Sequence, residues 1–335
     1  MSSELSLNYI NIMKKKNILL IIELYNNRNI SFLIYNKWIK IVNKFPEDQY
    51  IIYNNLLNYK NNKTNEFSCK HEPNFIILVS GQSNAGGWGS SYDINNINDQ
   101  PNENIYGYDI TNSIWKIANL NDSSLGDNKE KIPGTNLFAF HFAKHLIKKF
   151  PGLKPGIINV CSGGKPIANW ALYNKTDNYY KYNKEKANIV NIEQGYFFNQ
   201  HKVIYEKAIS QLSNSSNKIN VVLWHQGESD NILHSNTNYY NDALTKVIKQ
   251  YTILNNNLYT PFVAGTILDH YIENRNSNLI NNTIRKMKIK NNCYNFAELS
   301  KLKCNDDKLH FTSESHRIAG KLYFDSYIKI LEQYK

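Results

Sequence analysis

The stretch Phe75-Ile-Ile-Leu-Val-Ser-Gly-Gln-Ser-Asn-Ala-Gly-Gly87 decides how the rest of the chain is interpreted. An apolar run ends abruptly at Gly81-Gln-Ser-Asn84, and further glycines follow. Such a run, bounded by turn residues, is typical of a buried strand. Ser83 then lies just beyond a strand end. It fits a cap of a following helix, whose first turn would hold it, as well as it fits a nucleophile.

From residue 74 onward, short apolar runs alternate with longer amphipathic segments. The apolar runs are Phe75–Ser80, Gly156–Cys161, Ile219–Trp224, Pro261–Ile267 and Cys293–Glu298. The amphipathic segments are Asn136–Lys149, Gly195–Leu212, Asn238–Leu254, Ser277–Lys290 and Ser313–Tyr334. This alternation predicts an α/β fold, with a mostly parallel five-stranded sheet between two layers of helices. In such sheets, ligands bind beyond the carboxyl ends of the strands.

The first 70 residues differ from the remainder of the 335-residue chain. They contain Asn/Lys-rich connectors, and a helix is predicted from Pro46 to about Tyr59. We expect an accessory segment of unknown function over residues 1–70, followed by the main domain over residues 71–335. No apolar run approaches the roughly 20 residues that a membrane span requires. The run Ile18–Ile22 is short and is interrupted by Glu23, so we expect no signal peptide; the location is unknown, with an intracellular one favoured.

The formal net charge of +11 raises the question of a nucleic-acid partner. Lys residues are spread along the chain, and Asn, Ile and Tyr are over-used with them, as expected for a genome rich in A and T. No zinc-finger, KH or RRM signature is present, so we expect no specific nucleic-acid partner. None of the four Cys forms a CxxC pair, and we expect no metal site. Cys161 is predicted to be a buried thiol, whereas Cys293 and Cys304 could form a disulfide in an oxidising compartment.

A second motif, Cys161-Ser-Gly-Gly-Lys-Pro-Ile-Ala-Asn-Trp170, follows the second apolar run. Paired glycines allow backbone N–H groups to approach a ligand closely. Of the two, Gly164 is favoured over Gly163 as a donor to an oxyanion. For two adjacent glycines alone, a plain turn between strand and helix is the simpler interpretation.

A third motif, Val222-Leu-Trp-His-Gln-Gly-Glu-Ser-Asp230, follows the third run. The Gln226 amide is a candidate donor to an oxyanion. Glu228 and Asp230 are candidates for orienting neighbouring groups or capping the next segment. His225 directly follows the strand run, and we expect it to pack or hydrogen-bond structurally rather than act as a base.

A fourth motif, Asn305-Asp-Asp-Lys-Leu-His-Phe-Thr-Ser-Glu314, precedes the last predicted helix. The spacing of Asp307 and His310 lets the carboxylate hold one imidazole nitrogen and leaves the other for Ser83. Asp306 could take the orienting role instead, and an isolated Asp-x-x-His fits a helix-capping loop. With Ser83, however, these residues supply the nucleophile, base and carboxylate of acyl-transfer chemistry.

The four motifs in this order resemble the SGNH (GDSL-like) hydrolase superfamily, and within it the carbohydrate-esterase, sialate O-acetylesterase-like family. The resemblance spans about residues 74–330. It implies a flavodoxin-like three-layer α/β/α fold, no cofactor and an acetylated carbohydrate substrate. Carried over by position, it implies a triad, oxyanion donors and supporting residues. The triad is Ser83, His310 and Asp307; the donors are the Ser83 and Gly164 N–H groups and the Gln226 amide; the supporting residues are Asn84, Gly163 and Glu228.

Two departures from that family affect the substrate pocket rather than the triad. Lys165 replaces a small hydroxyl residue after the two glycines, and His225 replaces a common aromatic. The sequence thus predicts a serine esterase that removes O-acetyl groups from carbohydrates, with sialic acid or polysaccharide esters as candidates. The alternatives are an O-acyltransferase on the same scaffold and a catalytically silent glycan-binding module.

Overall fold

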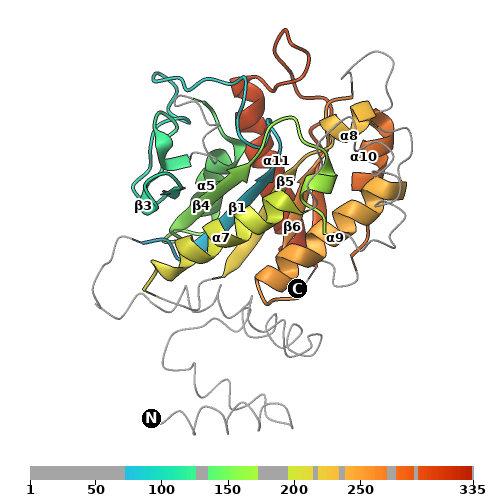
Figure 1. Cartoon of the computed structure of the whole chain (residues 1–335). Coiled ribbons are helices and arrows are strands. Elements are labelled where there is room, and N and C mark those ends of the chain that lie inside the picture. Colours follow the sequence, from blue (N-terminus) through green and yellow to red (C-terminus); the bar gives the residue numbers. More distant parts are fainter. Residues whose placement is uncertain are drawn as a thin grey trace, which may run out of the picture.

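The computed structural model describes residues 72–125, 135–172, 195–213, 218–233, 238–269, 277–289 and 293–333 (Figure 1). The predicted N-terminal accessory segment, with its Pro46–Tyr59 helix, lies outside these residues. So does Cys69. No helix in the described ranges is long and apolar enough to cross a membrane.

A seven-stranded sheet forms the centre of the molecule, with strand order β3-β2-β4-β1-β5-β6-β7. The strands are β1 (Phe75–Gly81), β2 (Tyr106–Asp109), β3 (Ile114–Ile117), β4 (Pro155–Cys161), β5 (Ile219–His225), β6 (Phe262–Gly265) and β7 (Tyr294–Ala297). All neighbours pair in parallel except β2 with β3. The five predicted strands have the order β4-β1-β5-β6-β7, which is flavodoxin-like, since the first of these five along the chain is flanked by the second and the third.

The prediction of five strands was incomplete, because two more strands extend the sheet beside β4: β2, which is parallel to β4, and β3, which is antiparallel to β2. Both are only four residues long, and the β3 side chains are partly or fully exposed. A short strand with an exposed face has no apolar run by which the sequence could reveal it.

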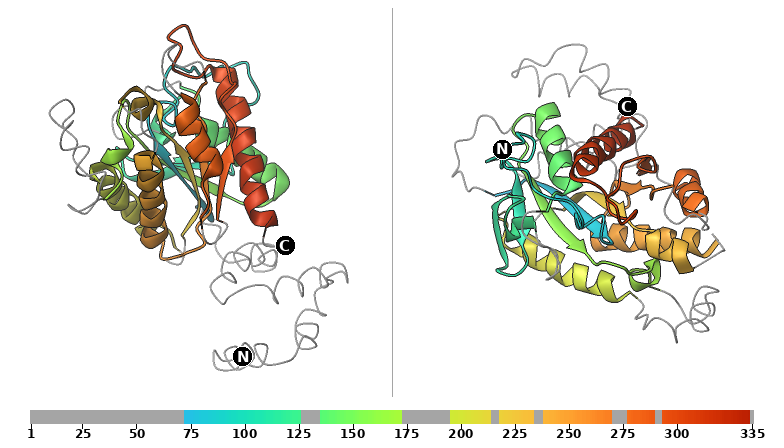
Figure 2. Two further views of the ribbon diagram at one scale, coloured as in Figure 1. Left: turned by 90° about the vertical axis from the view of Figure 1, so that its right-hand side faces the viewer. Right: turned by 90° about the horizontal axis from the view of Figure 1, so that it is seen from above.

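Helices cover both faces of the sheet, as the two further views show (Figure 2). The α-helices are α5 (Phe138–Lys149), α7 (Tyr196–Ser210), α8 (Glu228–Leu233), α9 (Asn238–Leu254), α10 (Ser277–Lys286) and α11 (Ser313–Glu332). Two 3-10 turns, η3 (Ser123–Leu125) and η4 (Ile167–Asn169), lie between strands and helices. The five predicted helical segments are therefore confirmed, with α7, α10 and α11 ending two to four residues earlier than predicted.

The strands have two apolar faces because both sides of the sheet are buried. In β1, Ile77 and Val79 pack with α5 and α11, whereas Ile76 and Leu78 pack with α7, α9 and α10. Alternation of this kind assigns consecutive side chains to opposite layers. The result is a three-layer α/β/α sandwich in which every parallel strand ends at the same edge.

Candidate active site

The turn after β1 brings Ser83 to the carboxyl edge of the sheet. Gly81 has a φ of +134°, and a Cβ added there would lie 2.0 Å from the His225 carbonyl oxygen of neighbouring β5. Only glycine therefore allows β1 and β5 to stay in contact at this point. The Gln82 N–H donates to the same carbonyl, at 2.9 Å. Ser83 follows with 4% of its surface exposed.

No helix follows Ser83, contrary to the expectation that Ser83 caps or begins one. Residues 83–89 form consecutive turns, in which the Ala85 N–H donates to the Gln82 carbonyl and the Trp88 N–H donates to that of Ser83. Gly87 and Gly89 both have positive φ, which a continuing helix excludes. The Ser83 N–H donates no hydrogen bond to a described residue, so it is free to receive an anionic oxygen.

His310 lies in the loop between β7 and α11, where Asp307 holds it. The Asp307 Oδ1 accepts hydrogen bonds from the N–H groups of Leu309 and His310, both at 2.9 Å. Its Oδ2 lies 2.7 Å from the His310 Nδ1. Burial raises the pKa of Asp307, but these two N–H donors and the imidazole outweigh it and hold the pKa below its usual value. Asp306 is exposed and forms no such contact with the ring.

Asn84 joins the Ser83 turn to the His310 loop from both sides of the histidine. Its Nδ2 donates to the Leu309 carbonyl at 3.1 Å, and its Oδ1 accepts from the Phe311 N–H at 2.9 Å. Asn84 is fully buried. Asn84, next to the candidate nucleophile, thus hydrogen-bonds to both residues that flank the candidate base, although the two segments lie more than 220 positions apart in the sequence.

Further contacts join the turn after Ser83 to the loop that contains His310. A Cβ added at Gly89 would lie 2.5 Å from the His310 Cβ. The Asn305 Nδ2 donates to the Gly89 carbonyl, and the Asn305 N–H donates to the His310 carbonyl at 2.9 Å. The Trp88 ring lies 6.3 Å from the imidazole. The segments that carry Ser83 and His310 thus adjoin, although the structure has no hydrogen bond between the Ser83 hydroxyl and the His310 Nε2.

The loop after β4 also contacts the turn that contains Ser83. The Ser162 N–H donates to the Gly81 carbonyl at 2.9 Å, and a Cβ added at Gly163 would lie 3.1 Å from the Trp88 ring. Gly164 has a φ of +65° and is exposed, with no atom within 4 Å of an added Cβ. Its N–H donates to no described residue. Gly164 therefore borders open space beside the Ser83 turn.

Gln226 is fully buried beneath this loop. Its Nε2 lies within hydrogen-bonding distance of three acceptors: the Asp230 Oδ2, the Lys165 carbonyl at 3.2 Å and the Gln82 Oε1 at 3.3 Å. The Asp230 Oδ2 also accepts from the Ile167 N–H at 2.8 Å. Burial raises the pKa of Asp230 to about 7. Gln226 and Asp230 thus hold the two ends of the segment that follows Gly164.

His225 and Glu228 form a buried pair behind Asn84. The Glu228 Oε1 accepts from Asn84 Nδ2 at 2.8 Å and lies 3.0 Å from the His225 Nε2. The side chains are 0% and 3% exposed, respectively. The structural role predicted for His225 agrees with this arrangement.

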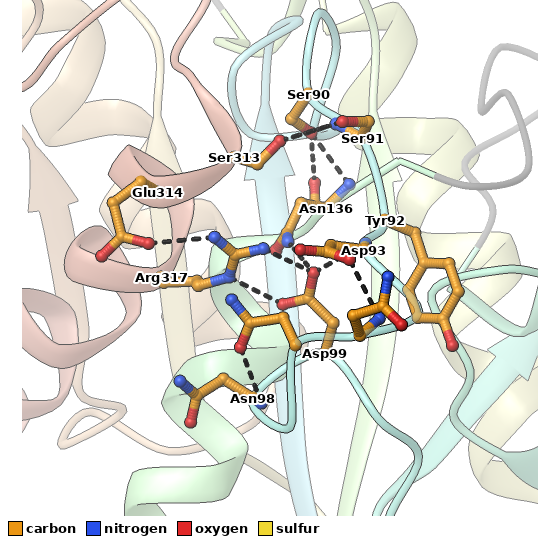
Figure 3. A network of polar contacts seen from close by, with 12 residues as sticks. Ser90, Ser91, Tyr92, Asp93, Asn98, Asp99, Asn136, Ser313, Glu314 and Arg317 are labelled. Atoms are coloured by element: carbon orange, nitrogen blue, oxygen red, sulfur yellow. Dashed lines mark hydrogen bonds and ion pairs between the residues drawn. The ribbon is translucent and has the colours of Figure 1, made fainter.

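A polar network below the site anchors the long loop after Gly89 (Figure 3). The fully buried Asp99 accepts two hydrogen bonds from Arg317 of α11, at 2.7 and 2.8 Å, and one from Asn136 at 3.0 Å. Ser90 bonds to the Asn136 backbone, and the Ser91 N–H donates to the Ser313 hydroxyl. The network ties the loop to the start of α11, immediately after His310.

The sequence analysis missed Trp88, Asn305 and the Asp99–Arg317 pair as parts of this region. Asn305 opens the fourth motif, and a motif-wide search could have included it. Asp99 and Arg317 are 218 positions apart, and no local signal connects them. The three described cysteines, Cys161, Cys293 and Cys304, form no disulfide with one another, and Cys161 is buried as predicted.

Comparisons with known proteins show the family and the fold of this chain. The family model described as "Carbohydrate esterase, sialic acid-specific acetylesterase" matches residues 73–329. A search among curated protein sequences finds no match. Among solved structures, a protein of Arabidopsis thaliana has 20% identity and a TM-score of 0.58, with 77% of this chain and 99% of that chain covered.

Two further solved structures share the fold. NanS has 14% identity and a TM-score of 0.54, with 77% of this chain and 98% of that chain covered. A carbohydrate acetylesterase from Xanthomonas citri has 15% identity and a TM-score of 0.52, with 77% of this chain and 57% of that chain covered.

Proposed function

Because this chain belongs to the carbohydrate esterase, sialic acid-specific acetylesterase family, we propose that it removes O-acetyl groups from carbohydrates by a serine mechanism. Ser83 is the proposed nucleophile, His310 the general base and Asp307 the carboxylate that orients the base. The observation that carries this proposal is the double contact of Asn84 with both flanks of His310, at 2.9 and 3.1 Å. It keeps nucleophile and base on adjoining segments.

In the first half-reaction, the His310 Nε2 takes the Ser83 proton as Oγ attacks the acetyl carbonyl carbon. Asp307 at Nδ1 fixes the tautomer that leaves Nε2 able to accept this proton. A hydrogen bond between the Ser83 hydroxyl and the His310 Nε2 is expected to form when substrate binds, since catalytic hydrogen bonds are often completed only in the substrate complex. His310 then protonates the departing sugar oxygen. Water activated by the same ring releases acetate from Ser83.

The Ser83 and Gly164 N–H groups are the proposed oxyanion donors. Both lie at the carboxyl edge of the sheet, and neither donates to a described residue. Gln226 is the third proposed donor. Its amide has two hydrogens for three present acceptors, so donation to the oxyanion requires release of one of them. Loss of one oxyanion donor lowers rate by about 10²–10³-fold in serine hydrolases.

The proposal is tested by Ser83→Ala, which should abolish hydrolysis of p-nitrophenyl acetate and of acetylated sialic acids and polysaccharides while the protein stays folded by circular dichroism. A fluorophosphonate probe should add its mass to the peptide that contains Ser83 in the wild-type protein only. Turnover by the variant at the wild-type rate would refute the assignment. Reaction in ¹⁸O-labelled water should place the label in acetate, whereas an acyltransferase would transfer unlabelled acetyl groups to an added sugar.

A further inference from the structure

The strand order places the segment after β5, which contains Glu228, beside the turn after β1, which contains Asn84. β1 and β5 are parallel neighbours, and Gly81 pairs with His225 at their carboxyl ends. Asn84 lies three residues beyond that pair on one chain segment, and Glu228 lies three residues beyond it on the other. Parallel strands end at one edge, so these two side chains meet directly.

Both hydrogens of the Asn84 amide are used, and its oxygen has a backbone donor. One Nδ2 hydrogen serves the Leu309 carbonyl, and the other serves Glu228 Oε1 at 2.8 Å. The Oδ1 accepts from Phe311. An amide in which oxygen and nitrogen exchanged places would present Oδ1 to both the Glu228 carboxylate and the Leu309 carbonyl. The Glu228 carboxylate, together with the Leu309 carbonyl and the Phe311 N–H, therefore determines which way the amide of Asn84 faces.

Glu228 is itself held in place. Its Oε1 also meets the His225 Nε2 at 3.0 Å, and the carboxylate is 3% exposed. Burial raises the pKa of Glu228, but the His225 charge and the hydrogen bonds from His225 and Asn84 outweigh burial and lower it. A buried carboxylate is costly to a fold unless paired, so this one is held as an acceptor at a fixed position.

We propose that Glu228 is a positioning residue for His310, acting through Asn84. Its carboxylate fixes the Asn84 amide, and that amide fixes the backbone on both sides of the base, which sets the distance from His310 to Ser83. The inference rests on the proposed function, because it assigns a role in that reaction. Glu228 touches neither Ser83 nor His310, so its effect reaches the chemistry only through this relay.

A reciprocal exchange tests the relay. Asn84→Asp places two carboxylates where an amide now donates to a carboxylate, and kcat should fall about 100-fold with KM nearly unchanged. Glu228→Gln keeps an oxygen acceptor and should lower kcat about fivefold. In the double variant, the amide introduced at 228 can donate to the carboxylate introduced at 84. Its kcat should exceed the product of the two single effects by about tenfold, as contacting residues couple.

Glu298→Gln is the matched control, because Glu298 pairs with Arg285 and Thr266 rather than with the site. Its kcat should equal that of wild type. All variants are first compared by circular dichroism and thermal unfolding, and the kinetics are measured well below the lowest midpoint. A merely structural role of Glu228 would change stability without rescue of kcat in the double variant.

Strictly multiplicative effects on kcat in the double variant would overturn the inference while leaving the proposed function intact. Wild-type protein without activity on any acetyl ester would instead refute the proposed function, and this inference with it. An effect of Glu298→Gln equal to that of Glu228→Gln would also overturn the inference, since the loss would not depend on the contact with Asn84.

Discussion

Replacement of Asp307 by Asn gives the sharpest test of the proposed triad. The wild-type carboxylate accepts three hydrogen bonds, two from backbone N–H groups at Oδ1 and one from the imidazole at Oδ2. In Asp307→Asn the remaining oxygen should stay with the two N–H donors, because turning the amide would leave both without an acceptor. The new NH₂ group would then face His310 Nδ1.

The expected loss follows from the tautomer that this NH₂ group selects. A donor beside Nδ1 requires that nitrogen to accept, so the proton of the neutral ring moves to Nε2, which can then no longer take the Ser83 proton. In a buried triad, the same exchange lowers kcat by about 10⁴-fold. Here the Asp307 side chain is 45% exposed and that of His310 is 18% exposed, so water competes for the ring. We therefore expect a loss of about 10²–10³-fold, smaller than in the buried case.

The assay is the kcat for p-nitrophenyl acetate at pH 7–8, with Asp306→Asn as the matched control. Asp306 neighbours Asp307, carries the same charge and is exposed, so its replacement controls for net charge and loop composition. The control should keep more than half of wild-type kcat. Equal losses in the two variants, or a loss below threefold in Asp307→Asn, would refute the assignment of the orienting carboxylate.

Two other variants test the scaffold. Gly81→Ala should lower the free energy of unfolding by about 3 kcal/mol or more, because the new Cβ would lie 2.0 Å from the His225 carbonyl oxygen at a φ of +134°. Urea unfolding measures this loss, and a change below about 1 kcal/mol would contradict the prediction. Asp230 has a folded pKa of about 7, above its unfolded value, so its contribution is fully present below about pH 4 and is lost as pH rises through 7. Asp230→Asn should remove this dependence, which amounts to up to about 4 kcal/mol. The free energy of unfolding of variant and wild type is measured between pH 4 and 8, and the same pH dependence in both proteins would contradict the prediction.

The fold was predictable where burial leaves a continuous apolar run. β1 and β5 are buried on both faces, and runs such as Phe75–Ser80 follow from that burial. β2 and β3 escaped detection because Tyr106–Asp109 contains a glycine and an aspartate, and because Ile114 and Ile117 face solvent. Their pairing is a property of the assembled sheet edge rather than of either segment.

The helix expected after Ser83 failed for a different reason. A serine beyond a strand end satisfies the local signal of a helix cap, but glycines at 86, 87 and 89 follow it, and two of them adopt positive φ. The chain turns back so that the Trp88 N–H reaches the Ser83 carbonyl. Backbone bonds of the strand-edge turn therefore outweighed the capping preference, and the Ser83 N–H was left unused at the edge of the sheet.

The sequence could predict the residues of the candidate site, but not how the loop that contains His310 is placed relative to Ser83. The contacts explain this difference. The His310–Asp307 pair is local: three residues separate the two, and the Asn305 N–H closes the loop on the His310 carbonyl. A motif of ten residues therefore contains the whole arrangement. The distance from this loop to Ser83 has no local determinant, because it depends on Asn84, on the carboxylate behind it and on glycine at 89.

Orientation of the base by Asp307 and its placement relative to Ser83 should therefore respond to different substitutions. Substitution of Asp307 removes the carboxylate that holds the imidazole of the base, while Asn84 still holds the backbone of the base. Substitutions at Asn84 or Glu228 leave the His310–Asp307 hydrogen bond intact and alter only where the pair stands relative to Ser83. Altered ionisation of the base changes the pH dependence of kcat, whereas a displaced base lowers kcat at every pH. The shape of the pH profile therefore separates the local half of this site from the half that depends on the assembled sheet.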